Sequence, residues 1–563
     1  MTRISLRGVA GAVAAAFTLI VWATGQAAAP APAPAVAAPD QYGADTGAEI
    51  LGAGGNAADA AVAIAFTLAV TYPSAGNLGG GGFATVLFDG KADFLDYRER
   101  APASASAGMY LDATGKAIPD ASTVGAGAAG VPGTVAGLWE LHRRFGRLTW
   151  QADLAPAIRY AEQGFPVGRM LAEECHSRAK ELRGRTNFRS YFGALADGDS
   201  FRQPELAATL KRIATDGPRG FYAGRTAELL IDEMARSHGH IAATDLEAYR
   251  VVWRKPLEAE WAGYHVITAP LPSSGGIVLL SMLAMKADLA PAFAGVSLNS
   301  VQYVHLVAEI EKRVFADRAS YLGDPDFTEA PVAQLLEPAY LARRAAEVNT
   351  AHPTPTADVK PGLAPHHNTT HFSVIDRIGN AVSNTYTLND DFGSGQVVTG
   401  AGFLLNNEMD DFSVKPGVPN IYGVVGGDAN AIAPGKRPLS TMTPTIVTQD
   451  GRATVIIGSE GGPSIATQVF QVLIAWHDFH MSLAAAVAAA RVHHQLLPAD
   501  TLIEEPYATL DPTVRTALIA RGYQFVNRGW NGDVQAIVLA GGQAVAVSDP
   551  RGRGVAQVLG PRP

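Results

Sequence analysis

Residues 366–389 read HHNTTHFSVIDRIGNAVSNTYTLN, and two threonines stand in this stretch where a loop becomes a strand. After them, apolar and polar residues alternate on both sides of Gly379-Asn380, which predicts two strands paired around a turn. A threonine at the start of a strand is usually explained by its β-propensity alone. The rest of the chain has to decide whether Thr369 and Thr370 do more than this.

The composition indicates a large folded enzyme or binding protein that acts on a small molecule. Of the 563 residues, 47% are hydrophobic and only 17% are charged, which is ample material for a large apolar core. The formal net charge is −9, and the chain has no run of Lys or Arg that would form a basic stripe. We therefore expect no nucleic-acid partner.

Motifs for cofactors and metals fail when their context is tested. Residues 52–57 satisfy the G-x-G-x-x-G/A pattern, but they do not follow a strand-like segment, so they favour a helix cap over a dinucleotide site. His366-His367 and His493-His494 lack the i, i+4 spacing of helical zinc ligands. The single cysteine, Cys175, excludes an intrachain disulfide. We expect no metal and no other cofactor.

The N-terminus is typical of an exported protein. Arg3 and Arg7 precede an apolar run over residues 9–23, and small residues follow it. The run is shorter than the roughly 20 residues of a membrane span, although an uncleaved anchor is the alternative. We predict a signal peptide at 1–29, an Ala/Pro linker at 30–41, a fold that begins near Tyr42, a periplasmic or secreted location and no stable membrane anchor.

The remaining chain predicts helices first and strands later. Apolar residues recur at helical spacing in the segments Ala57–Val70, Thr134–Phe145, Ala152–Gln163, Glu205–Thr215, Ala227–Ser237, Val301–Ala319, Pro338–Glu347, Gln468–Trp476 and Leu483–Arg491. Strands are expected at Phe83–Phe88, Ala92–Asp96, Tyr264–Ala269, Thr443–Thr448, Ala453–Gly458, Tyr523–Asn527, Val534–Leu539 and Ala544–Ser548. Sheets covered by helices on their outer faces would use this material.

The segment before the two threonines is predicted to be a loop. Residues 351–367 read AHPTPTADVKPGLAPHH, with prolines and no apolar periodicity. Its position directly before Thr369 makes it a candidate site of peptide-bond cleavage as well as a linker.

Three polar clusters lie in glycine-rich turns, at residues 406–411, 436–441 and 458–462. Singly they are explained as an acidic turn, a basic loop and a tight turn. Together, carboxylates, amides and hydroxyls suit the ammonium and carboxylate of an amino acid, and glycine N–H groups suit an oxyanion hole.

Many separate motifs follow one another along the chain. They are GNLGGGGF at 76–83, LDYRE at 95–99, VPGTVAG at 131–137, PSSGG at 272–276, ADR at 316–318, GDP at 323–325, TTH at 369–371, NNEMDDF at 406–412 and RPLS at 437–440. In this order they resemble the motifs of the γ-glutamyltransferases, a branch of the N-terminal nucleophile hydrolases. The resemblance implies an α+β fold, a four-layer αββα sandwich. It also implies self-cleavage between Asn368 and Thr369 into a large subunit, 42–368, and a small subunit, 369–563, that form a heterodimer.

The resemblance makes Thr369 the catalytic nucleophile. A neutral α-amine freed by cleavage, with a reference pKa of about 7.7–8.0, can act as the base for its hydroxyl without a histidine. Thr387 is implied near that hydroxyl, with Gly461 and Gly462 at the oxyanion. A γ-glutamyl ester on Thr369 would then be resolved by water or by an amino acid or peptide acceptor.

The resemblance also assigns the donor site. Arg98, Ser440 and Thr441 are implied at the α-carboxylate of a γ-glutamyl donor such as glutathione. Its α-ammonium is implied to contact Asn389, Glu408 and Asp411.

Two positions depart from the usual pattern, and one loop resembles a lid. Thr441 stands where many relatives have serine, and Glu460 stands where proline commonly precedes the two glycines. Residues 415–423 resemble the lid loop of some relatives, so we expect a partly covered pocket.

Two other functions remain as alternatives. A related acylase would remove glutaryl groups from β-lactam nuclei with the same nucleophile. Asp411 discriminates, because a glutaryl group has no ammonium to pair with it. A binding protein that has lost catalysis is the second alternative, and intact Thr369, Thr387, Gly461 and Gly462 argue against it.

We predict that the smaller chain of the purified protein begins TTHFS, because the loop ends and the strand starts at Thr369. Edman sequencing and intact-mass measurement would check this. Thr369→Ala should leave one full-length chain, since the hydroxyl that attacks the preceding peptide bond is gone. Efficient cleavage of that variant would exclude the assignment.

Overall fold

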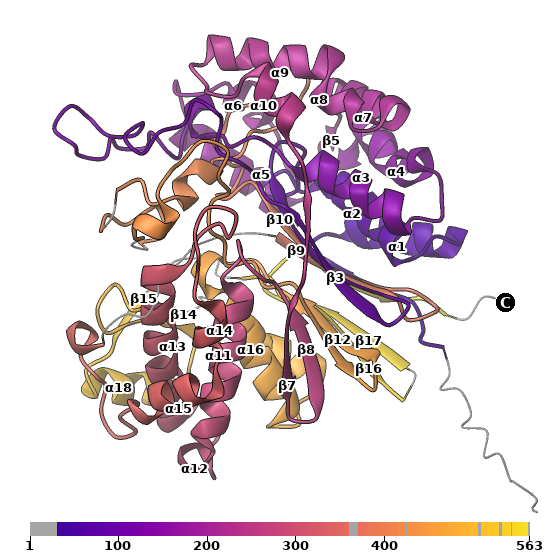
Figure 1. Ribbon diagram of the computed structural model, residues 1–563. Helices are drawn as coiled ribbons and strands as arrows, with labels where there is room; N and C mark the ends of the chain where they lie inside the picture. Colours follow the sequence, from indigo (N-terminus) through magenta and orange to yellow (C-terminus); the bar gives the residue numbers. More distant parts are fainter. Residues whose placement is uncertain are drawn as a thin grey trace, which may run out of the picture.

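The computed structural model describes residues 31–359, 370–415, 417–423, 426–504, 508–527, 532–541 and 543–560, without the side chains of residues 319 and 320 (Figure 1). The predicted signal peptide, Asn368 and Thr369 lie outside these residues. Within them, no helix is long and apolar enough to cross a membrane.

Two antiparallel sheets form the centre of the fold. The first has the strand order β18 (Val555–Val558), β1 (Ala35–Ala38), β9 (Thr370–Ile375), β10 (Ala381–Thr387), β2 (Gly81–Phe88), β3 (Lys91–Tyr97) and β6 (Val252–Arg254). The second has the order β17 (Gln543–Ser548), β16 (Gln535–Ala540), β12 (Arg452–Gly458), β11 (Thr445–Gln449), β8 (Tyr264–Thr268) and β7 (Leu257–Trp261). Smaller sheets join β13 (Val492–His493), β14 (Thr501–Glu504) and β15 (Gln524–Asn527), and β4 (Phe165–Pro166) with β5 (Ser200–Phe201).

Helices cover the outer face of each sheet (Figure 1). On the first sheet lie α1 (Gln41–Ala53), α2 (Ala57–Thr71), α3 (Thr134–Phe145) and α4 (Trp150–Gln163), and on the second α11 (Gly275–Asp288), α13 (Val301–Tyr321) and α16 (Ile465–His477). The other helices are α5 (Arg169–Glu181), α6 (Phe188–Phe192), α7 (Pro204–Asp216), α8 (Arg219–Tyr222), α9 (Gly224–Arg236), α10 (Ala243–Ala248), α12 (Ala290–Phe293), α14 (Val332–Leu335), α15 (Pro338–Ala346), α17 (Leu483–Ala488) and α18 (Pro512–Ala520).

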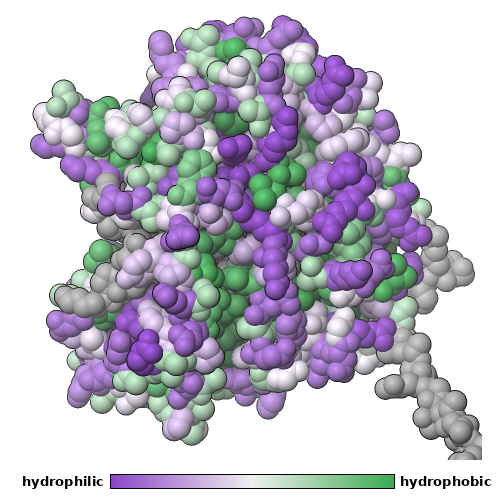
Figure 2. All heavy atoms as spheres, viewed as in Figure 1, coloured by the Kyte–Doolittle hydropathy of each residue, from purple (hydrophilic) through white to green (hydrophobic). Residues whose placement is uncertain are grey.

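Alternating side chains along the strands build three apolar layers. On β12, Ile456 packs between the two sheets, whereas Val455 and Ile457 face the helices. On β9, Ile375 lies between the sheets and Val374 faces the helices of the other side. This two-residue period is what a strand buried on both faces requires. The layers therefore run helix, sheet, sheet, helix, and the predicted αββα sandwich is confirmed. Figure 2 shows hydrophilic and hydrophobic residues mixed over the visible face, with hydrophobic residues gathered near its centre.

The glycine-rich motif at residues 52–57 is a helix boundary, as its context predicts. Gly54 ends α1 with φ +100°, a conformation that favours glycine. Asn56 then caps α2 and forms a capping box with Asp59.

The expectation of a flexible linker through residue 41 is wrong. Ala35–Ala38 form β1, which is fully buried and pairs with both β18 and β9. Alanine has low β-propensity, so the sequence conceals this strand. Ala35 and Ala37 face the second sheet, while Val36 packs against α1. The fold thus begins before Tyr42.

We predict that Val36→Ala lowers the free energy of unfolding by about 2 kcal/mol, because it leaves a cavity between β1 and α1. Denaturant unfolding of the processed protein would measure this. Val558→Ala on the neighbouring strand is the matched control. Val558 is 47% exposed, so its loss should cost less than about 0.5 kcal/mol. Equal effects of the two substitutions would show that β1 is not part of the core.

Candidate active site

The glycine-rich segment 76–82 brings the start of β2 against the end of β10. A Cβ on Gly80 would lie 1.9 Å from the carbonyl oxygen of Thr387, so only glycine permits this approach. The amide of Asn77 fixes the turn, because its Nδ2 donates to the same Thr387 oxygen at 2.8 Å and its Oδ1 accepts from the Gly80 N–H at 3.0 Å. The motif therefore positions Thr387.

Thr387 continues into a chain of polar contacts. Its Oγ1 accepts a hydrogen bond from the Asn389 N–H at 2.7 Å, and Asn389 Nδ2 donates to the Asn407 carbonyl at 3.0 Å. Asn389 has φ +78°, which asparagine tolerates better than most residues. Next to Asn407 begins a short 3₁₀ helix, Glu408–Asp411. The structure thus links the predicted Thr387 and Asn389 to the acidic turn.

Arg98 joins the acidic turn to the first sheet. It follows β3 directly and is 0% exposed, so it is not a surface charge. Its guanidinium donates to Glu408 and to Asp411, and it lies 3.4 Å from Glu99. Removing one partner of a buried ion pair typically costs about 3–5 kcal/mol. This cluster therefore fixes where the turn lies.

The titration of this cluster reflects its burial. Burial raises the pKa of Glu408 and of Asp411, and Arg98 opposes the rise in both. Burial alone would lower the pKa of Arg98, but the charges of Glu408, Asp411 and Glu99 outweigh it, and the pKa is raised. Burial also raises the pKa of Glu99 well above its usual range, with the charge of Glu408 adding to the shift. The guanidinium therefore stays charged, and the three neighbouring carboxyl groups share it as their positive partner.

The chain segment that leads to the predicted hydroxyls contacts the same guanidinium. Arg98 Nε and Nη2 donate to the carbonyls of Pro438 and Leu439, each at 3.3 Å. Ser440 and Thr441 follow in sequence and are fully buried. Arg98, Glu408, Asp411, Ser440 and Thr441 are thus brought together.

Two further residues of this region were missed by the sequence reasoning. Arg318 donates from Nε to Ser274 Oγ at 2.5 Å and from Nη2 to Thr441 Oγ1 at 3.1 Å. Both residues belong to motifs of the resemblance, PSSGG and ADR. The motifs were the available signal, but a motif match gives no side-chain direction.

Gly461 and Gly462 form the turn that opens α16. Their φ angles are +122° and +59°, and a 3₁₀ turn, Gly462–Ser464, leads into the helix. N–H groups at a helix N-terminus favour a negative charge. Upstream on β12, Gly458 packs against the ring of His371 on β9. The described residues show no direct contact between the two glycines and the Arg98 cluster.

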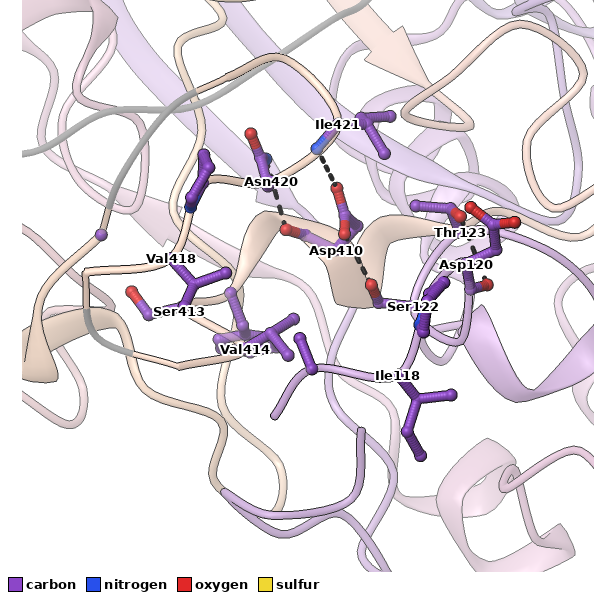
Figure 3. A pocket seen from close by; sticks show the side chains of 15 residues that line it. Ile118, Asp120, Ser122, Thr123, Asp410, Ser413, Val414, Val418, Asn420 and Ile421 are labelled. Atoms are coloured by element: carbon purple, nitrogen blue, oxygen red, sulfur yellow. Dashed lines mark hydrogen bonds between the residues drawn. The ribbon is translucent and has the colours of Figure 1, made fainter. Parts of the chain in front are cut away.

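The predicted lid loop is seated on the site. Tyr422 Oη donates to the Asn389 carbonyl at 3.0 Å. The Ile421 N–H donates to Asp410 Oδ2 at 3.1 Å, and Ser122 Oγ donates to the same carboxylate at 2.6 Å (Figure 3). Ile421, Asp410 and Ser122 line a cavity of about 170 Å³ beside the acidic turn. Burial raises the pKa of Asp410 to about 6.

One group of potential metal ligands lies elsewhere in the described part of the chain. His142 Nδ1 is 2.8 Å from Asp153 and 3.9 Å from Asp59. The Asp59 carboxylate already accepts from the N–H groups of Asn56, Arg147 and Leu148. The Asp59 carboxylate therefore has a structural role, because its contacts join the N-terminus of α2 to the residues that follow α3.

Comparison with known proteins agrees with this geometry. The family model described as Gamma-glutamyltranspeptidase matches residues 43–559. The chain is 59% identical over 528 residues to a glutathione hydrolase proenzyme of Pseudomonas aeruginosa, covering 94% of this chain and 95% of the relative.

Two solved structures are similar to this chain. A γ-glutamyltranspeptidase from Pseudomonas nitroreducens, complexed with L-DON, is 56% identical, with a TM-score of 0.57 over 58% of this chain and 97% of the other. A cephalosporin acylase from Bacillus halodurans is 28% identical, with a TM-score of 0.81 over 94% of this chain and 97% of the other.

The αββα sandwich defines an N-terminal nucleophile hydrolase. Within that class, the chain belongs to the γ-glutamyltranspeptidase family. The resemblance drawn from its motifs is confirmed, and with it the predicted enzyme class, γ-glutamyltransferase.

We predict that Tyr422→Phe speeds hydrogen exchange of the amides in residues 417–423 by about 2- to 10-fold, because a hydrogen bond worth about 0.5–1.5 kcal/mol is lost. Exchange followed by mass spectrometry would measure this. Tyr42→Phe is the control, since Tyr42 Oη also donates to a backbone carbonyl, that of Pro166, at 3.0 Å. Unchanged exchange in the Tyr422 variant would mean that the loop is held by other contacts.

Proposed function

We propose that the protein cleaves the γ-glutamyl bond of glutathione and related γ-glutamyl compounds through an ester on Thr369. The buried cluster of Arg98 with Glu408 and Asp411 carries this proposal, together with its contact to the segment that leads to Ser440 and Thr441. It places a cation and two acids within one buried cluster, as the α-carboxylate and α-ammonium of a glutamyl donor require. The relative from P. aeruginosa named above, a glutathione hydrolase proenzyme, supports glutathione as the donor.

The charges of the donor match those of this cluster. Its α-carboxylate pairs with Arg98 and the hydroxyls of Ser440 and Thr441. Its α-ammonium pairs with Glu408, Asp411 and the side chain of Asn389. The donor therefore replaces contacts that Arg98 makes with its own acids, and the released carboxylates bind the ammonium instead. Such an exchange leaves no buried charge unpaired.

The reaction uses the N-terminus of the small subunit. Cleavage between Asn368 and Thr369 frees an α-amine, which takes the proton of the Thr369 hydroxyl as its oxygen attacks the γ-carbonyl. Gly461 and Gly462 donate to the oxyanion, the C–N bond breaks, and the leaving amine takes the proton. Water or an acceptor amine then attacks the ester. The strand register supports a position of Thr387 close to the Thr369 hydroxyl, because Tyr386, the residue before Thr387, pairs with Thr370.

Glutamyl donors are favoured over glutaryl donors by Asp411. This acid is 1% exposed and accepts a hydrogen bond from Arg98. A glutaryl group would displace it from Arg98 without offering an ammonium in return. The desolvated carboxylate would then cost several kcal/mol.

Export to the periplasm or the outside of the cell completes the proposal. The charged start, the apolar run over residues 9–23 and the small residues after it support a cleaved signal peptide. Free amino acids or peptides would then serve as acceptors.

We predict that Arg98→Lys lowers kcat/KM for a γ-glutamyl anilide by about 10- to 150-fold, because a charge-assisted, bidentate contact worth about 1.5–3 kcal/mol is lost. Steady-state kinetics on fully processed enzyme would test it. Self-cleavage should persist, since it needs Thr369 and no donor. A processed variant with unchanged KM and kcat would remove Arg98 from the donor site.

A further inference from the structure

We infer that Arg318 is a positioning residue of the donor site, which orients the Thr441 hydroxyl toward the α-carboxylate of the donor. This inference rests on the proposed function, because it takes Thr441 as a carboxylate contact. Arg318 itself contacts no part of the donor.

The first argument is hydrogen-bond direction. A guanidinium has only donors, so a hydroxyl that it contacts must accept there and point its own proton elsewhere. Arg318 Nη2 donates to Thr441 Oγ1 at 3.1 Å. The Thr441 proton is therefore turned away from Arg318 and remains available to a ligand oxygen.

The second argument is that Arg318 is itself held in place. Its Nε donates to Ser274 Oγ at 2.5 Å, and that hydroxyl donates to the Ser440 carbonyl at 2.7 Å. The Ser274 N–H donates to the same carbonyl at 2.8 Å. Arg318 is 1% exposed. The Arg318 fork and the Ser440-Thr441 backbone therefore form one rigid unit.

The third argument is the arrangement of the two buried guanidiniums. Arg98 donates to the carbonyls of Pro438 and Leu439, and Arg318 contacts the next two residues. The two guanidiniums thus contact four consecutive residues of the chain, 438–441. Burial lowers the pKa of Arg318, and the negative charge of Asp411 opposes this fall. A carboxylate bound at Ser440 and Thr441 would lie in the field of both cations.

Lysine should fail at this position even though it keeps the charge. Its single ammonium cannot reproduce the planar fork that reaches Ser274 and Thr441 together. The defect concerns binding of the donor, so it should appear in KM more than in kcat.

The experiment is steady-state kinetics of Arg318→Lys with a γ-glutamyl anilide, normalised to the processed fraction seen on a gel. We expect donor KM to rise about 10-fold with kcat changed less than about 3-fold, as loss of one charge-assisted hydrogen bond predicts. In a Thr441→Val background the same substitution should change KM less than about 2-fold, because its target hydroxyl is absent. An equal rise in both backgrounds would overturn the inference.

Arg344→Lys is the matched control. Arg344 is also a buried arginine, and it donates to Asp317, the neighbour of Arg318, at 2.9 Å. This variant should lower the unfolding midpoint and leave donor KM unchanged. If both variants raised KM alike, Arg318 would act through general packing of α13.

Ser274→Ala keeps the test open if Arg318→Lys does not fold or process. It removes the acceptor of Arg318 Nε, so KM should rise about 3-fold, and this rise should vanish with Thr441→Val. No rise, or an additive one, would overturn the inference. Arg98→Lys separates the two proposals: if it raises KM while Arg318→Lys and Ser274→Ala do not, only the role of Arg318 fails.

Discussion

The structure of the candidate site depends on one constraint, the neutralisation of acids that lie in the interior around Arg98. Glu99, Glu408 and Asp411 are each at most 1% exposed, and Arg98 is their direct partner. Unpaired, such groups would be too costly to bury. The cluster therefore requires that the end of β3, the acidic 3₁₀ turn and the segment 438–441 meet at one point. A site with charges of both signs is the direct result of satisfying that requirement.

Backbone geometry allows two further close approaches between segments of the fold. Glycine 80 lets β2 approach the end of β10, and Gly458 lets β12 approach His371 on β9. In both cases a side chain would collide with the neighbouring segment. The glycine-rich motifs are therefore explained by the close approach of segments far apart in the sequence, while the acids and hydroxyls between them supply the chemistry.

The sequence predicted much of this, and the failures have physical causes. Amphipathic helices such as α3 were found at their observed bounds because one face is apolar. The helix α11 was missed, since its buried residues surround its axis and leave no period to detect. Strand β1 was missed because alanines conceal it. At the site, the motifs pointed to Arg98, Glu408 and Asp411, but the ion pair among them and the role of Ser274 beside Arg318 depend on side-chain directions that no linear pattern encodes.

The strand order has a consequence for the two chains that the proposed cleavage would produce. In the first sheet β9 and β10 lie between β1 and β2, and in the second β11 pairs with β8. With a cut before Thr369, each sheet contains strands of both chains, hydrogen-bonded edge to edge. Neither product could then keep its sheets alone, and separation would amount to unfolding. Such a cut would therefore leave two chains that stay associated through the sheets they formed as one molecule.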